Sequence, residues 1–383
     1  MIELLRRADA ARPAIVTDDA TVTYGELVTR AERAARALRD KGIERFASLD
    51  HDAITVATLF GAASLAGAEA CQYPPLDDAD ELATLRKRFD HEVVIGGRED
   101  IPDGMERMDV AELLSSEPSA QHEPAARPHL VLTTGTTGTP RGVRHDWTRL
   151  LRSTGRIPST PDQRWLLAYG LHQFAGLQIL LHVFAAGATL VAPALRRPRE
   201  GLAAMRAHGV DHASATPTYW RFLLAELRAD GGATPQLAQI TLGGEAVPAP
   251  VLAELARTFP QAKISHVYAA SEFGSSGSVR DGRSGLSLDV LDRGDDADVA
   301  MKIVDGELWV RSRVGMLGYY GEEPVDPDGW RPTGDLVEIV DNRIVFRGRT
   351  SEVINVGGVK VHPLPIEERV GAVAGVDMAR VYG

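Results

Sequence analysis

Residues 129–143 read HLVLTTGTTGTPRGV, an apolar run followed at once by a loop of threonine and glycine. Glycines let backbone N–H groups converge on phosphate oxygens, and threonine hydroxyls add further donors. Arg141 adds a positive charge. A Walker-type loop needs a lysine after its second glycine, and this loop has none. The pattern therefore predicts a strand followed by a phosphate-binding loop outside the ordinary NTPase class, with a flexible surface turn as the alternative.

Short apolar runs alternate with helical patterns beyond this loop. The runs cover residues 165–168, 188–191, 240–242 and 264–268, and the helical stretches cover 177–184, 218–229 and 250–258. This alternation favours an α/β fold with a substantial parallel sheet. From Asp281, short strands with tight turns predict a β-rich subdomain that ends at Arg349. Residues 97–128 are rich in proline, serine and acids, which predicts a surface connection.

The composition excludes several classes of protein. The 383 residues carry a net charge of −11, which argues against a general binder of nucleic acid or of an anionic membrane. No apolar stretch reaches the roughly 18–20 residues that a spanning helix needs. The N-terminus has acids and arginines where a signal peptide has an apolar core. Since Cys71 is the single cysteine, we expect a cytoplasmic protein without disulfides.

The loop at 133–142 resembles the phosphate loop of the adenylate-forming superfamily, which comprises acyl- and aryl-CoA synthetases, adenylation domains of peptide synthetases and luciferases. Further motifs resemble those of the family and follow in its order. They are Leu171–Gly176 beside the acyl pocket, Leu242–Glu245 beside adenine, Tyr268–Glu272, Gly318–Tyr320, Asp328–Trp330 with Thr333–Asp335, Phe346–Arg349 and Ile354–Val361. The resemblance thus covers nearly the whole chain.

This resemblance implies an α/β fold of defined layout. We expect a large N-terminal adenylating domain over residues 1–349, with two αβ subdomains of mostly parallel sheet and a β-rich subdomain. Residues 350–383 would form the hinge and a short remnant of the C-terminal lid. The implied reaction activates a carboxylic acid with ATP and Mg²⁺ to an acyl-AMP, and then transfers the acyl group to a thiol.

The resemblance also assigns roles to residues. Thr133 would be catalytic together with Glu272 and Arg141, and Glu272 would hold Mg²⁺, a hard cation that prefers carboxylate oxygen. Asp335 would accept hydrogen bonds from both ribose hydroxyls. The residues expected to bind the nucleotide are Thr133, Thr134, Gly135, Thr136, Thr137, Gly138, Gly243, Gly244, Glu245, Tyr268, Ala269, Ser271, Asp335 and Arg349.

The acyl-pocket segment indicates the kind of acid. Residues 170–176 contain no acidic side chain that could pair with an α-amine, which favours an aryl or medium acyl acid without an α-amino group. The residues expected to bind this substrate are His172, Gln173, Phe174, Gly176 and Tyr219. The acceptor would be CoA or phosphopantetheine, the latter on an acyl carrier protein, and a homodimer stays open.

The C-terminal region departs from the family. Relatives carry a lid with a lysine that contacts the carboxylate and the α-phosphate, whereas Lys360 belongs by motif to the strand pair after the hinge. Three explanations stay open: a fragment of a longer chain, a short protein whose lysine comes from a partner or is dispensable, and a nucleotide- or adenylate-binding pseudo-enzyme or regulatory subunit.

Overall fold

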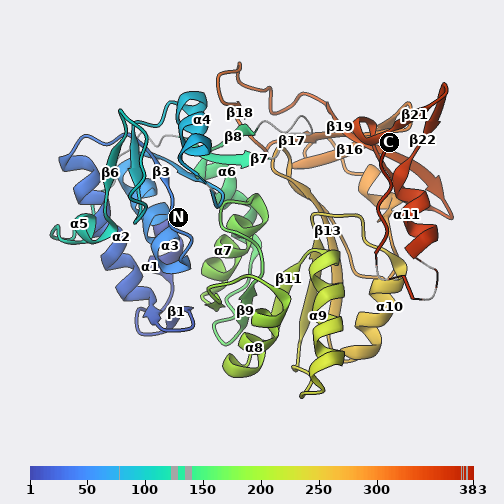
Figure 1. The fold of residues 1–383 in the computed structure, drawn as a ribbon, viewed down its shortest axis with the longest axis horizontal. Coiled ribbons are helices and arrows are strands. Elements are labelled where there is room, and N and C mark those ends of the chain that lie inside the picture. Colours follow the sequence, from blue (N-terminus) through green and yellow to red (C-terminus); the bar gives the residue numbers. More distant parts are fainter. Residues whose placement is uncertain (77, 122–127, 134–139, 372, 374, 377) are drawn as a thin grey trace.

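The computed structural model describes residues 1–76, 78–121, 128–133, 140–371, 373, 375–376 and 378–383. The chain folds into two αβ lobes and a β-rich part, as Figure 1 shows. Among the described residues, no helix combines the length and the apolar character that a membrane crossing needs.

The N-terminal sheet contains the strand that precedes the threonine-rich loop. Its strands are β3 (Arg45–Ser48), β4 (Glu69–Gln72), β5 (Val93–Ile95), β6 (Glu106–Met108), β7 (His129–Thr133), β8 (Arg141–His145) and β18 (Gly318–Tyr319). They lie in the order β18-β8-β7-β4-β3-β5-β6. The strands from β7 to β6 run parallel, and β8 returns antiparallel to β7 with Thr133 opposite Arg141. The loop expected to hold phosphate therefore joins two antiparallel neighbours, and its residues 134–139 lie outside the described part.

The central sheet confirms the predicted alternation of strands and helices. Its strands are β1 (Pro13–Val16), β2 (Thr21–Thr23), β9 (Arg164–Leu167), β10 (Thr189–Val191), β11 (His212–Ala215), β12 (Gln239–Gly243), β13 (Lys263–Ala270) and β14 (Gly274–Val279). They lie in the order β14-β13-β12-β11-β9-β10-β1-β2, and only the pairs at the two edges are antiparallel. Neighbouring parallel strands therefore end at one common edge.

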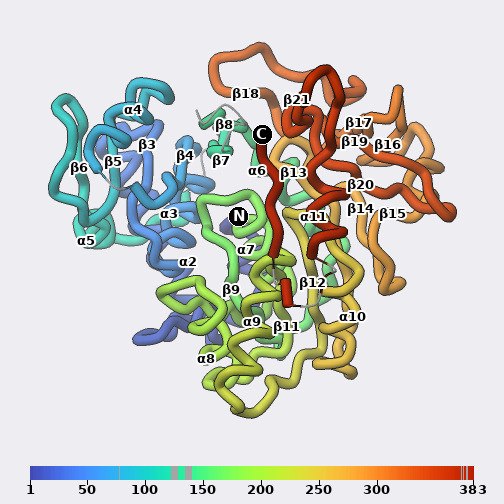
Figure 2. Tube along the Cα trace, turned by 45° about the vertical axis from the view of Figure 1, so that its right-hand side comes forward, coloured from blue at the N-terminus to red at the C-terminus, as the bar shows by residue number. Residues whose placement is uncertain are grey.

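The β-rich part forms a separate antiparallel sheet. Its strands are β15 (Leu286–Ser287), β16 (Val299–Val304), β17 (Glu307–Ser312), β19 (Arg331–Val340) and β20 (Arg343–Arg349). The chain continues through the hairpin of β21 (Ile354–Val356) and β22 (Val359–Val361) into α11 (Pro363–Gly371), which packs against β20. Figure 2 shows this C-terminal region in red, next to β20. The domain boundary at Arg349 stays a prediction.

Two helices form the apolar interior between the N-terminal and central sheets. Besides α11, the described residues form the helices α1 (Ile2–Arg7), α2 (Tyr24–Asp40), α3 (Ala53–Ala66), α4 (Ala79–Phe89), α5 (Val110–Leu114), α6 (Trp147–Arg152), α7 (Phe174–Ala186), α8 (Pro198–His208), α9 (Pro217–Asp230) and α10 (Ala249–Thr258), with 3₁₀ turns at Ser153–Arg156, Leu288–Leu291 and Thr350–Glu352. The two interior helices are α3 and α7. Both α3 and α7 are apolar on most faces, and their side chains share one buried cluster with α1 and α2. Such helices are stable only when neighbours cover them on all sides.

One expectation about the N-terminal lobe is wrong. The segment predicted to be a surface connection contains β6 and α5 in its described residues, and β6 extends the sheet by pairing with β5. Only Met108 of β6 is buried, so the strand shows almost no apolar pattern.

Gly176 allows α7 to lie close to the chain that precedes it. A Cβ at this position would stand 2.2 Å from the Gly170 carbonyl oxygen. We expect Gly176→Ala to lower the free energy of unfolding by about 1–3 kcal/mol, because the backbone must move apart. Urea denaturation measures this loss. Gly155→Ala is the matched control, since a Cβ there meets nothing within 4 Å; equal effects of the two substitutions would contradict the packing argument.

Interior histidines predict acid sensitivity. Burial lowers the pKa of His129 and His145 to about 3 and that of His172 and His182 to about 4, against about 6.5 in an unfolded chain. The unfolded state therefore binds more protons below pH 6.5, so stability falls as the pH falls from there towards the folded pKa values. We expect a loss of about 2.5 kcal/mol for each fully buried histidine between pH 7.5 and 4.5.

His129→Phe tests this assignment. The His129 ring lies 4.6 Å from the Phe60 ring and 4.9 Å from the Trp147 ring, contacts that phenylalanine can keep. Urea unfolding at the two pH values should show a smaller difference for the variant than for the parent protein. The same pH dependence in both would count against His129 as a source.

Candidate active site

Three predicted nucleotide-binding residues meet on one carboxylate. The Tyr268 hydroxyl donates to Asp335 Oδ2 at 2.6 Å, and Arg349 Nε donates to Asp335 Oδ1 at 3.0 Å. Tyr268 is near the end of β13, whereas Asp335 and Arg349 are opposite each other on β19 and β20. The Phe346 ring stacks on Tyr268 at a centroid distance of 5.2 Å. The structure thus brings Tyr268, Asp335 and Arg349 together from two sheets.

The electrostatics of this group keep its hydrogen bonds in place. Burial and the nearby Asp335 carboxylate raise the pKa of Tyr268, so its hydroxyl stays a donor. Burial lowers the pKa of Arg349, but Asp335 outweighs this effect and the net shift is upward. The Asp335 side chain is 11% exposed and that of Arg349 is 50% exposed. A ligand can therefore reach the group from the arginine side.

The predicted metal ligand lies in the turn between β13 and β14. Glu272 Oε1 accepts a hydrogen bond from the Tyr319 hydroxyl at 3.0 Å. Burial, followed by the Glu272 carboxylate, raises the pKa of Tyr319. The guanidinium carbon of Arg141 lies 3.3 Å from the Tyr319 ring centroid, and Arg141 Nη2 donates to Glu322 at 2.7 Å. Glu272 and Arg141, which are far apart in the sequence, thus both contact Tyr319.

The loop after β12 is held by polar contacts. Gly244 has a φ of +84°, a conformation that favours glycine. Glu245 Oε2 accepts from the Thr218 backbone N–H at 3.1 Å and from its hydroxyl at 2.7 Å. The Tyr169 hydroxyl donates to the Gly243 carbonyl at 3.2 Å. These contacts fix the Gly243–Glu245 loop at the carboxyl end of the central sheet.

The acyl-pocket segment leads into α7, which begins at Phe174. Gln173 Oε1 accepts from the Gly170 backbone N–H at 3.1 Å, and the Phe174 ring stacks on His145 at 5.0 Å. His172 lies 6.1 Å from the His51 ring.

Tyr219 makes no contact with these residues that the structure records, and its role as a substrate residue stays a prediction. Its side chain is 9% exposed within the core of the central lobe, and its hydroxyl donates to the Arg197 carbonyl at 3.4 Å. Gly201 leaves the space that this hydroxyl fills, since a Cβ there would stand 1.9 Å from it.

The remaining predicted residues are placed in part. Thr133 ends β7, and its hydroxyl donates to the Arg141 carbonyl at 3.4 Å. Ala269 belongs to β13, and Ser271 begins the turn that carries Glu272. Thr134, Gly135, Thr136, Thr137 and Gly138 lie outside the described residues.

Sequence reasoning missed Tyr319 and Phe346 as members of the site. Both stand in segments that it did single out, Gly318–Tyr320 and Phe346–Arg349, but neither spacing nor composition shows that Tyr319 contacts Glu272. In the described part of the chain, no group of three or more His, Cys, Asp or Glu side chains could hold a metal ion.

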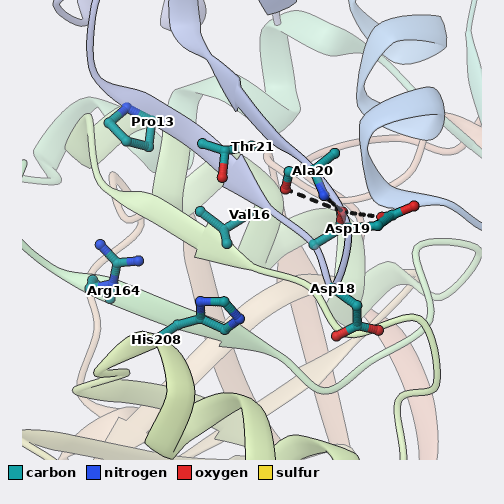
Figure 3. Close-up of a pocket in the computed structure, with 9 residues that line it drawn as sticks. Pro13, Val16, Asp18, Asp19, Ala20, Thr21, Arg164 and His208 are labelled. Carbon is teal, nitrogen blue, oxygen red and sulfur yellow. Dashed lines mark hydrogen bonds between the residues drawn. The ribbon is translucent and has the colours of Figure 1, made fainter.

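Two surface hollows lie apart from these residues. Figure 3 shows one of them beside the β1–β2 turn, lined by residues that include Asp18, Asp19, Arg164 and His208, with a volume of about 370 Å³. A second hollow of about 440 Å³ is lined by Arg45, Glu69, Pro128, Arg144, Tyr320 and Gly321. Neither hollow is lined by a residue predicted to be catalytic or to bind nucleotide or substrate. Tyr320, which lines the second hollow, belongs to the Gly318–Tyr320 motif.

Comparisons with known proteins identify the family and the fold of the chain. Residues 5–320 match the family described as AMP-binding enzyme. The 2-succinylbenzoate–CoA ligase of Escherichia coli K12 is 27% identical over 272 residues, which cover 68% of this chain and 56% of the relative, so the match spans little more than half of that enzyme. The long-chain-fatty-acid–CoA ligase FadD13 of Mycobacterium tuberculosis is 26% identical, with 95% of this chain and 80% of the relative covered.

Solved structures share the fold. The o-succinylbenzoate CoA synthetase of Bacillus subtilis, in complex with its acyl-adenylate intermediate, superimposes with a TM-score of 0.81 at 22% identity, covering 100% of this chain and 84% of the other. The anthranilate CoA ligase AuaEII, in complex with anthranoyl-AMP, gives a TM-score of 0.86 at 19% identity, covering 100% and 83%. The expected α/β layout with its β-rich part is confirmed, and the chain belongs to the AMP-binding enzyme family.

Proposed function

We propose that this protein activates a carboxylic acid as its acyl-adenylate and transfers the acyl group to a thiol. The acid oxygen attacks the α-phosphorus of ATP and pyrophosphate leaves. The thiol sulfur then attacks the acyl carbon, and AMP and a proton are released. The observation that carries the proposal is the meeting of Tyr268, Asp335 and Arg349 on one carboxylate, near the end of a strand whose next turn holds Glu272.

The nucleoside would bind at Asp335. Each oxygen of this carboxylate accepts one hydrogen bond from the protein and retains a lone pair for a ribose hydroxyl. Phe346 stacks on one face of Tyr268, so adenine would use the other face. The Gly243–Glu245 loop would border the base, because β12 and β13 are adjacent parallel strands.

The phosphate end would lie near Glu272. Tyr319 donates to Oε1 of this carboxylate, which leaves Oε2 for a cation. When bound, Mg²⁺ would neutralise charge on the phosphate oxygens. Arg141 adds a second cation after exchanging Glu322 for phosphate, since its guanidinium already lies over the Tyr319 ring. Thr133 and residues 134–138 stay predicted phosphate ligands.

The substrate class rests on the segment before α7. Residues 170–176 carry no acid, while His172, Phe174 and the neighbouring His145 offer rings. Burial holds the pKa of His172 at about 4, so it would present a neutral ring at pH 7. Aromatic acids suit such walls. Support comes from the relatives named for succinylbenzoate and anthranilate, and the acceptor would be CoA, as in those names.

A carrier-protein thiol is the alternative acceptor, because one relative is named a medium/long-chain-fatty-acid–[acyl-carrier-protein] ligase. A nucleotide-binding protein without turnover is the second candidate function. Such a protein would need the Asp335 group but not a carboxylate positioned for a cation, and the contact between Tyr319 and Glu272 favours the enzyme.

Glu272→Gln tests the enzymatic role. With ATP, Mg²⁺ and a panel of aryl and medium-chain acids, we expect the parent protein to release pyrophosphate and the variant to be at least about 100-fold slower, in line with the removal of one stabilising charge. AMP affinity should stay within threefold, because the contacts assigned to the ribose come from Asp335 and not from Glu272. Glu254→Gln is the control: this glutamate of α10 pairs with Arg228 of α9.

The outcomes separate the candidates. Pyrophosphate release by the parent with no loss in Glu272→Gln would refute the assigned role. Tight AMP binding without release for any acid would favour the binding protein.

Asp335→Asn tests the nucleoside site. The amide keeps the shape of the carboxylate but loses its negative charge, which strengthens the hydrogen bonds from Tyr268, from Arg349 and from the bound ribose. AMP affinity should therefore fall about 10- to 100-fold. Isothermal titration measures it. Asp328→Asn, which removes an exposed carboxylate paired with Arg313, should bind AMP as the parent does. Equal AMP affinity in Asp335→Asn and the parent would place the ribose elsewhere.

A further inference from the structure

Arg331 carries a buried guanidinium without a hydrogen-bonding partner. It is the first residue of β19, directly after Trp330. Its Nε, Nη1 and Nη2 atoms are all buried, and none of them has a hydrogen-bond partner in the described part of the chain. The other arginines near the site do have acceptors: Arg141 has Glu322 and Arg349 has Asp335.

An arrangement of this kind is costly. A guanidinium stays charged in proteins and offers five N–H donors, so burying it without acceptors costs several kcal/mol. Burial lowers the pKa of Arg331, whereas Tyr319 and Glu272 act in the opposite direction. The guanidinium carbon lies 5.3 Å from the Phe273 ring centroid, a contact that stabilises the charge but accepts no in-plane hydrogen bonds.

The location of this charge suggests what would satisfy it. Phe273 follows Glu272 in the chain, and Tyr319 contacts Glu272 directly, so Arg331 lies beside the turn that carries the predicted metal ligand. Arg149 places a second positive charge nearby, and its Nη1 donates to the Met316 carbonyl at 3.3 Å. Arg331 and Arg149 thus place two positive charges beside the single negative charge of Glu272.

We propose that Arg331 is an oxyanion-binding residue of the active site, which donates hydrogen bonds to a phosphate or carboxylate oxygen of the bound reactants. The proposal rests on the adenylation reaction proposed above. That reaction joins two anions, and a buried cation lowers their repulsion more than an exposed one does. Arg331 makes and breaks no covalent bond: it would hold one oxyanion while the acid oxygen attacks phosphorus.

Arg331→Met tests the proposal, with Arg331→Gln as a neutral variant that keeps polar donors. The matched control is Arg206→Met, which removes an arginine of α8 that pairs with Asp230 of α9. Each protein is titrated with adenosine, AMP, pyrophosphate with Mg²⁺, and an acid that the parent protein turns over. The thermal midpoint is measured with and without each of these probes.

We expect both Arg331 variants to bind adenosine as the parent does and to lose at least tenfold in affinity for one anion. A loss for AMP identifies the α-phosphate, a loss for pyrophosphate identifies the leaving group, and a loss for the acid alone identifies the carboxylate. Without ligand, Arg331→Met should melt at or above the parent temperature, because an unpaired buried charge has been removed. Arg206→Met should show no loss of affinity.

A purely structural role gives the opposite pattern. If the folded Met or Gln variant binds all four probes and turns over as the parent does, the proposal is overturned. If Arg331→Met does not fold, the Gln variant decides. A parent protein that binds no AMP and releases no pyrophosphate would instead refute the adenylation function itself.

Discussion

One carboxylate connects the central sheet to the β-rich sheet. Asp335 accepts from Tyr268 of β13 through one oxygen and from Arg349 of β20 through the other, and it is nearly buried. A buried carboxylate needs such partners, because an unsatisfied charge in the interior costs several kcal/mol. The pair of Asp335 with Arg349 also fixes the register of β19 against β20. The contact that stabilises the junction of the sheets is therefore the same contact that we assign to the nucleoside.

Strand direction explains why the other pieces of the site lie close by. In the central sheet, β9, β12 and β13 run parallel, so the turns after them emerge at one edge. Those turns carry the segment before α7, the Gly243–Glu245 loop and Glu272. The strand β18 lies in the N-terminal sheet, and its Tyr319 reaches Glu272 of the central sheet. The site therefore lies where the two αβ lobes and the β-rich part meet, and a change in any one of them would alter its geometry.

The sequence predicted the parts of this arrangement that depend on local pattern. Apolar runs of strand length alternate with helical patterns, so the α/β class followed from local pattern, whereas the grouping of Tyr268, Asp335 and Arg349 came from the resemblance to the adenylate-forming superfamily. The contact of Tyr319 with Glu272 joins residues 47 positions apart, and no local signal specifies such a pair. The position of the Tyr219 hydroxyl depends on the missing side chain of Gly201 on another helix, which no local pattern specifies. The strand β6 was missed because its stability comes from pairing with β5 rather than from its own apolar residues.

The ion pairs of the site differ in how easily a phosphate group can replace the protein carboxylate. Arg141 and Arg349 are paired with protein carboxylates, each with a half-exposed guanidinium that water can screen. Exposed pairs of this kind contribute about 1 kcal/mol or less, so a phosphate can replace Glu322 at little cost. The Asp335 pair is different, because its carboxylate is buried and must keep its partners while the ribose binds. Nucleotide binding would therefore rearrange the phosphate end and leave the nucleoside end fixed, which orients the nucleotide before the two reacting anions meet.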